Sequence, residues 1–128
     1  MKSREQALLL YRKAADDMAL LVEVITSAQV SDEIFGFHCQ QAAEKLLKAL
    51  LSASAVDFPR SHNLRLLMDM LADSGNSLPG NLADLDLLTP YGTLFRYESL
   101  SVDAVLDRQR FLKMIRVLYQ LVENSLAK

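Results

Sequence analysis

The sequence has few residues that cross-link a chain or break a helix: one cysteine, three prolines and four glycines among 128 residues. It has no tryptophan. The single cysteine, Cys39, excludes an intramolecular disulfide and is typical of a reducing compartment. No apolar run reaches the length that spans a membrane, and charged residues follow the first apolar run too closely for a signal peptide. We therefore expect a cytoplasmic protein.

Neither sign of charge dominates the chain, because its formal net charge is only -2. This near balance argues against a surface built mainly to bind long duplex nucleic acid, although it leaves room for a local basic patch. The sequence has no glycine-rich phosphate loop, and its two histidines and one cysteine do not make a metal-ligand pattern. We expect no cofactor and no bound metal.

What the sequence has in abundance is helical periodicity. With 51% hydrophobic residues the chain can bury a core, and we expect one domain over residues 1–128. Apolar spacing predicts two long helices over residues 4–26 and 32–55, a short one over 63–74, a fourth over 81–99 disturbed by Pro90 and Gly92, and a last one capped by Ser101. Strand-like alternation is absent. Short connections between helices predict an all-α, up-and-down four- or five-helix bundle.

The second of these helices contains the stretch FHCQQAAEKLLKALL, residues 37–51, which mixes polar with apolar side chains. A helical wheel predicts one arc in the core, made of Phe35, Cys39, Ala42, Ala43, Leu46, Ala49, Leu50 and Ala53. The opposite arc contains Gln40, Gln41, Glu44, Lys45 and Lys48. This polar arc has two interpretations: a solvated face with a Glu44–Lys48 ion pair, or one wall of a binding site.

One aromatic residue does not follow this pattern. Phe37 projects among the polar residues of the second helix, where its ring stays in water unless something covers it. In the first helix Leu9, Leu20 and Val24 form a second, smaller apolar strip away from the main face. A partner chain is one cover and a neighbouring loop is another. We expect a homodimer with Phe37 in its interface.

Four segments resemble, in order and spacing, the HEPN family of small helical proteins: DDM at 16–18, FHCQQAAEKLLKALL at 37–51, FPRSHNL at 58–64 and LFRYES at 94–99. The resemblance covers nearly the whole chain. It implies a four- or five-helix bundle, commonly a dimer, of the kind found with minimal nucleotidyltransferase partners in prokaryotes, including toxin–antitoxin pairs. It also implies a role in binding nucleotides or RNA.

Many HEPN proteins are ribonucleases with an Arg-x4-6-His signature, and this sequence lacks it. Neither His38 nor His62 follows an arginine at the required distance. His62 is expected to cap or pack a turn, and His38 to be a hydrogen-bonded histidine at the edge of the core. Arg96 and Tyr97 match the family's Arg-Tyr pair, in which arginine can hold a phosphate and the ring can stack a base. Glu98 replaces the usual proline and would repel an anion.

These observations favour a non-catalytic binding and assembly module. We expect it to partner a nucleotidyltransferase and to bind a nucleotide or single-stranded RNA at a site formed by Gln41, Lys45, His62, Arg96 and Tyr97. Two alternatives remain open. One is a divergent, toxin-like ribonuclease that uses His62 or His38 with Arg60 or Arg96 across a dimer. The other is a purely structural dimeric bundle without a ligand.

Overall fold

The computed structural model describes residues 2–92 and 105–128. Four α-helices and one 3-10 helix lie in this part of the chain: α1 (Lys2–Val24), α2 (Asp32–Ala53), α3 (Leu64–Asp73), η1 (Gly80–Gly92, the 3-10 helix) and α4 (Arg108–Leu126). Every regular element in these ranges is helical, which confirms the all-α bundle.

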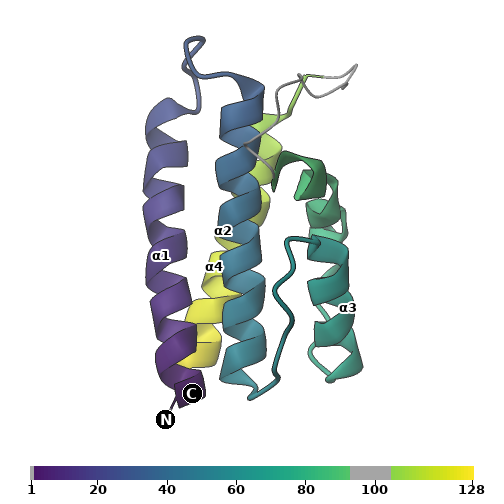
Figure 1. Ribbon diagram of the computed structural model, residues 1–128. Helices are drawn as coiled ribbons and strands as arrows, with labels where there is room; N and C mark the ends of the chain where they lie inside the picture. The colour runs from purple at the N-terminus through teal and green to yellow at the C-terminus, as the bar shows by residue number, and fades with distance from the viewer. Residues whose placement is uncertain (1, 93–104) are drawn as a thin grey trace.

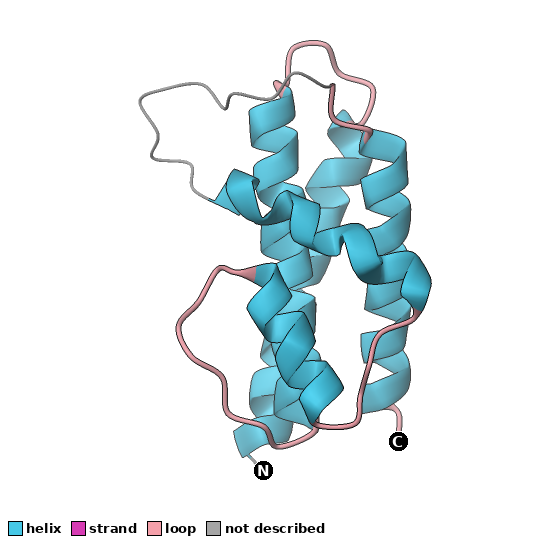
Figure 2. Ribbon diagram, turned by 90° about the vertical axis from the view of Figure 1, so that its right-hand side faces the viewer, coloured by secondary structure: helices cyan, strands magenta, loops and turns pink. Residues whose placement is uncertain are grey.

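The long helices α1, α2 and α4 run alongside one another, and the N- and C-termini lie close together at one end of the bundle (Figure 1). α3 and η1 form an additional layer at one side of this bundle (Figure 2). Among the described elements only α2 packs against all the others. As the central helix, it has neighbours on most of its circumference.

Side-chain caps define where three of the helices begin. Ser31 caps α2 as the sequence predicts, because its hydroxyl accepts a hydrogen bond from a backbone N–H in the first turn. Asn63 and Asp107 cap α3 and α4 in the same way. The expected start of the last helix was wrong, since the described helix begins only at Arg108. The predicted cap, Ser101, lies outside the described residues.

The fourth predicted helix is present as the 3-10 helix η1, which contains Pro90 and ends at Gly92 in the described part of the chain. It packs very closely on α2, because a Cβ at Gly36 would lie only 2.3 Å from the ring of Tyr91. Gly36 is therefore required for this approach of η1 to α2. The rest of the predicted helix, residues 93–99, lies outside the described residues.

Burial along α2 agrees with most of the predicted core arc but differs from the predicted polar arc. Leu46 and the residues around it are buried, whereas Leu50 is only partly buried and Ala53 is exposed. Gln40 and Glu44, which the wheel assigned to the polar arc, are buried as well. The wheel fails here because α3 and η1 cover a side of α2 that a two-sided amphipathic helix would leave in water.

On the surface, Leu9 and Leu20 are exposed, as the predicted outer strip of α1 requires. Val24 was assigned to the same strip, but it is partly buried and packs against the core. Phe37 is half-buried and meets the ring of His38 edge to face. The dimer interface stays a prediction. None of the helices within residues 2–92 and 105–128 has the length and apolar character that crossing a membrane requires.

Candidate ligand-binding site

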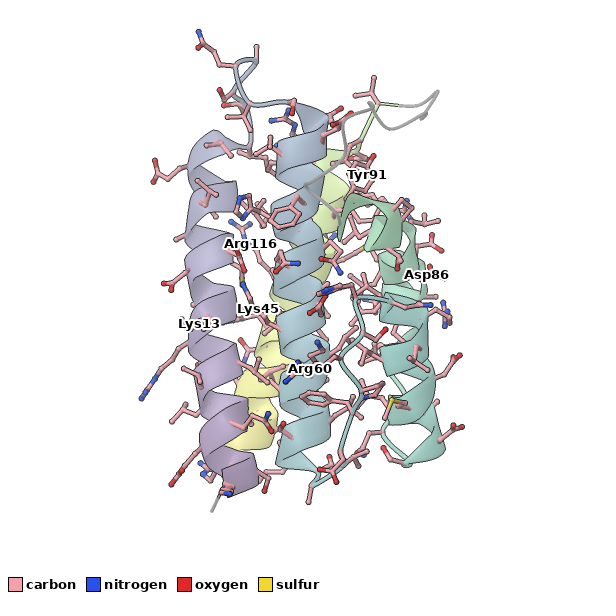
Figure 3. All side chains as sticks on the ribbon, in the orientation of Figure 1. Lys13, Lys45, Arg60, Asp86, Tyr91 and Arg116 are labelled. Carbon is pink, nitrogen blue, oxygen red and sulfur yellow. The ribbon has the colours of Figure 1, made fainter. Side chains whose placement is uncertain are left out.

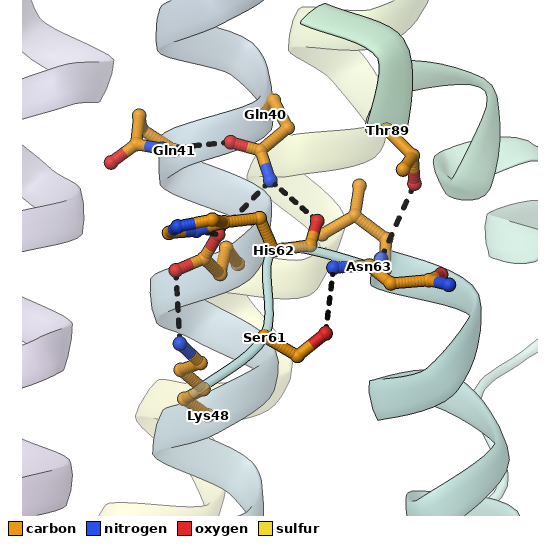
Figure 4. A network of polar contacts seen from close by, with 9 residues as sticks. Gln40, Gln41, Lys48, Ser61, His62, Asn63 and Thr89 are labelled. Carbon is orange, nitrogen blue, oxygen red and sulfur yellow. Dashed lines mark hydrogen bonds and ion pairs between the residues drawn. The ribbon is translucent and has the colours of Figure 1, made fainter. Parts of the chain in front are cut away.

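A polar cluster centred on Glu44 joins α2 to the loop before α3 (Figure 4). One carboxylate oxygen of Glu44 contacts Nδ1 of His62 at 2.8 Å, and the other accepts a hydrogen bond from Nζ of Lys48 at 3.0 Å. The Glu44 side chain is only 9% exposed, whereas that of His62 is 72% exposed. The cluster therefore holds an imidazole at the surface by means of a buried carboxylate.

The ionisation of Glu44 follows from these contacts. Burial acts to raise the pKa of the carboxyl, but hydrogen bonds from Gln40, Lys48 and His62 outweigh it and lower the pKa below its ordinary value. Glu44 is therefore ionised at neutral pH and accepts hydrogen bonds only. Nδ1 of His62 must then carry the proton in this contact, and Nε2 is left as the ring nitrogen for a ligand.

A second cluster with the same plan lies between α1 and α2. Asp17 of α1, with a side chain only 11% exposed, contacts Nδ1 of His38 at 3.0 Å through one oxygen. Its other oxygen accepts a hydrogen bond from Nζ of Lys45 at 2.5 Å. Figure 3 shows Lys45 in the space between the two helices. His38 is thus a hydrogen-bonded histidine at the edge of the core, as the sequence predicts.

Together the clusters organise one line of side chains along α2. His38, Gln41, Lys45 and Lys48 are half-buried and recur every three or four residues, so they share one face of the helix. We call these four residues the α2 ridge. Each lysine gives one hydrogen bond to a buried carboxylate and has further N–H donors on the same ammonium group. The lysines of the ridge can therefore donate hydrogen bonds to an anion while the buried carboxylates offset part of their positive charge.

Among the predicted site residues, Gln41 and Lys45 lie on this ridge, and Gln40 links Gln41 to His62. Gln41 donates to the side chain of Gln40, which in turn donates to the backbone carbonyl of His62. The expectation that His62 caps the turn was wrong, because Asn63 caps α3. The His62 ring instead contacts Glu44 and so joins the turn to α2. Arg96 and Tyr97 lie outside the described residues, so their place in the site stays a prediction.

Sequence reasoning missed two buried residues, Asp17 and Gln40, that hydrogen-bond to side chains of the ridge. Asp17 lies three residues after the buried Ala14 and four before the buried Leu21, so helical spacing alone places this carboxylate on the core face. Gln40 precedes Leu47 by seven residues and shares a buried face with it. A buried polar group at an apolar position needs a hydrogen-bond partner, and this requirement is the signal that could have identified both.

A cavity of about 620 Å³ lies away from the ridge, next to the C-terminal parts of α2 and α4 and the loop between α3 and η1. Its walls include Leu50, Ser54, Asn76 and Leu121, but not Gln41, Lys45 or His62. We place the candidate site at the ridge because the polar groups that could bind a ligand converge there. The described residues contain no group of three or more His, Cys, Asp or Glu side chains placed to hold a metal ion.

The comparisons with known proteins give one match. A family model described as HEPN domain matches residues 7–125, which is nearly the whole chain. No curated protein and no solved structure matches the chain.

Proposed function

This chain belongs to the HEPN family, and on that premise we propose that it is a non-catalytic binding and assembly module that binds a nucleotide or a short single-stranded RNA. One observation carries the proposal: two buried carboxylates hold cationic or titratable side chains along α2, Asp17 holding Lys45 and Glu44 holding Lys48 and His62. The proposed ligand site consists of Gln41, Lys45 and His62, together with Arg96 and Tyr97.

The chemistry of the ridge supports a phosphate-bearing ligand. The ammonium group of Lys45 has three N–H donors, of which Asp17 takes one. Gln41 offers an amide oxygen that a base or ribose hydroxyl can reach. Since the buried carboxylates offset part of the lysine charge, we expect weak binding that falls as the salt concentration rises.

Calorimetric titration at two salt concentrations tests this proposal, with a nucleoside triphosphate and a short single-stranded RNA as probes. The wild-type protein should bind one of them, and Lys45→Ala and Arg96→Ala should each weaken the binding about tenfold, the loss of one charge-assisted hydrogen bond. Lys113→Ala removes the same charge from an exposed position on α4 and should change nothing. Failure of the wild type to bind either probe would refute the proposal.

The absence of the Arg-x4-6-His signature supports a role without catalysis. One observation favours the ribonuclease alternative: His38 and His62 both contact a carboxylate through Nδ1, which leaves Nε2 to transfer a proton. Incubation with RNA separates the two functions. Cleavage that is lost in His62→Ala and in Arg96→Ala would establish the ribonuclease. No cleavage by the wild type is the result we expect.

For partners, we propose a homodimer and a nucleotidyltransferase-domain protein. The exposed Leu9 and Leu20 and the half-buried Phe37 support an interface along α1 and α2. Light scattering at high micromolar concentration should give the mass of a dimer, and Phe37→Asp should give a monomer. An intact dimer in that variant would exclude Phe37 from the interface. Co-expression with a nucleotidyltransferase-domain protein should give a stable complex.

A further inference from the structure

Gln40 has a side chain whose hydrogen-bonding groups are all used inside the protein. The residue is fully buried, with an exposed fraction of 0%. Its Nε2 group donates to Glu44 Oε1 and to the backbone carbonyl of His62, both at 3.0 Å, and its Oε1 accepts from Nε2 of Gln41 at 2.8 Å. A primary amide has two N–H donors and one oxygen, so the set is complete.

Gln40 also lies under the end of η1. A Cβ at Gly92 would come within 2.9 Å of the amide carbon of Gln40, which is closer than real side chains approach. The amide thus lies between the backbone of Gly92 and the loop that carries His62. Figure 4 shows its hydrogen bond to that loop. Any side chain at position 92 would have to displace it.

His62 depends on this anchor. Its ring is mostly in solvent, and its side chain contacts Glu44. An exposed side chain loses conformational entropy when it is held in one rotamer, so a single hydrogen bond keeps the ring in place only if the backbone beneath it is fixed. Gln40 fixes that backbone through the carbonyl of His62, and it also orients the Glu44 oxygen that meets the ring.

We propose that Gln40 is the positioning residue of the ligand site, because it holds the His62 imidazole on Glu44 and the Gln41 amide on the α2 ridge. The role in ligand binding rests on the function proposed above. The role in orienting His62 does not, and it can be measured without a ligand.

The first experiment follows the ring nitrogens of His62 by NMR. In the wild type the contact with Glu44 requires a proton on Nδ1, so the nitrogen shifts of neutral His62 should report that tautomer. Gln40→Met keeps the length of the side chain but removes its hydrogen bonds. It should shift His62 to the mixed tautomers of a solvent-exposed histidine. Gln120→Met is the matched control, because Gln120 is exposed on α4 and donates a hydrogen bond to Asn124, away from His62.

The second experiment compares affinities for the nucleoside triphosphate or RNA probe in a double-mutant cycle. Gln40→Met and His62→Ala should each weaken binding about tenfold, as expected for one charge-assisted hydrogen bond. Because Gln40 acts partly through His62, the double variant should bind more tightly than the product of the two single losses predicts. Fully additive losses would overturn the proposal.

A variant at Gly92 keeps the proposal testable if Gln40→Met does not fold. Gly92→Ala keeps the glutamine at position 40 but displaces its amide, so the His62 tautomer should shift in the same direction. An unchanged His62 spectrum in a folded Gln40→Met or Gly92→Ala protein would refute the positioning role. A shifted spectrum in a protein whose wild type binds no probe would refute the proposed function and leave the positioning role intact.

Discussion

Two regions of the molecule enclose charged side chains, one partly and one almost fully, and the charges have different partners in the two regions. At one end of the bundle the guanidinium of Arg108 binds the carboxylate of Asp32 and the backbone carbonyls of Val24, Ser27 and Val30. At the α2 ridge the carboxylate of Glu44 binds side chains instead.

The two regions differ in whether the groups bound to the charged side chain can make further hydrogen bonds. Backbone carbonyls at the end of α1 and in the loop before α2 are fixed acceptors, and Arg108 satisfies them while it packs over the ring of Phe35. Lys48 has further N–H donors on the ammonium group that binds Glu44, and the mostly exposed His62 has a second ring nitrogen. A buried charge paired with backbone therefore holds the fold together, whereas a buried charge paired with long side chains can present them to a ligand.

The largest effect is expected from Arg108→Ala. The change leaves three backbone carbonyls and Asp32 without the guanidinium. Since the pair is only partly buried and hydrogen bonds to a charged group contribute about 1.5 to 3 kcal/mol, the combined loss should be about 3 kcal/mol. Denaturant unfolding measures this loss. Arg110→Ala is the control, because its ion pair with Asp84 is exposed and such pairs contribute about 0 to 1 kcal/mol. If Arg108→Ala and Arg110→Ala lost equal free energy of unfolding, the structural role of Arg108 would be refuted.

A smaller effect is expected from Glu44→Gln, which removes the charge but keeps the shape. Hydrogen bonds to a charged group contribute about 1.5 to 3 kcal/mol, so the variant should lose about 2 kcal/mol of stability at neutral pH. The loss should depend on pH in a defined direction.

The pKa of Glu44 is lower in the folded protein than its ordinary value of 4.5, so its stabilisation is fully present above that value. It is lost as the pH falls through the folded-state pKa. Wild type and Glu44→Gln should therefore converge in stability as the pH falls below 4.5 and through the folded-state pKa, in unfolding curves measured over a pH series. Glu23→Gln, an exposed position on α1, should show no such convergence. A constant difference at all pH values would contradict the lowered pKa.

The smallest effect on stability is expected from His62→Ala. The ring is 72% exposed, and exposed substitutions usually stay within about 0.5 kcal/mol. The same variant should weaken ligand binding. A thermal melt beside the calorimetric titration therefore tests the contrast with Arg108 directly, since a stability loss above about 2 kcal/mol would make His62 another structural residue.

Much of the fold follows from the sequence. The apolar spacing of α1 and α2 predicts both helices to within a few residues, since a 3.6-residue period is a local property of the chain. Ser31 is recognisable as a cap for the same reason, because its partner lies within the next turn. The Glu44–Lys48 pair is also local, and it forms as the spacing predicts.

The site was only partly predictable, because its key contacts join residues far apart in the chain. The polar character of residues 40–48 is visible in the sequence, and so is a histidine in the loop that follows. That His62 meets Glu44, and that Asp17 meets Lys45, depends on how the helices and the loop pack.

The sequence by itself determined that the chain forms amphipathic helices and which polar residues could share a face. Only the tertiary structure decided which of those polar residues are buried. α1 lies on one side of α2, and α3 and η1 lie on another, so water is excluded from Gln40 and Glu44 although the wheel leaves both exposed. Burial makes each hydrogen bond there necessary, and the bonds in turn orient the side chains of the α2 ridge and His62.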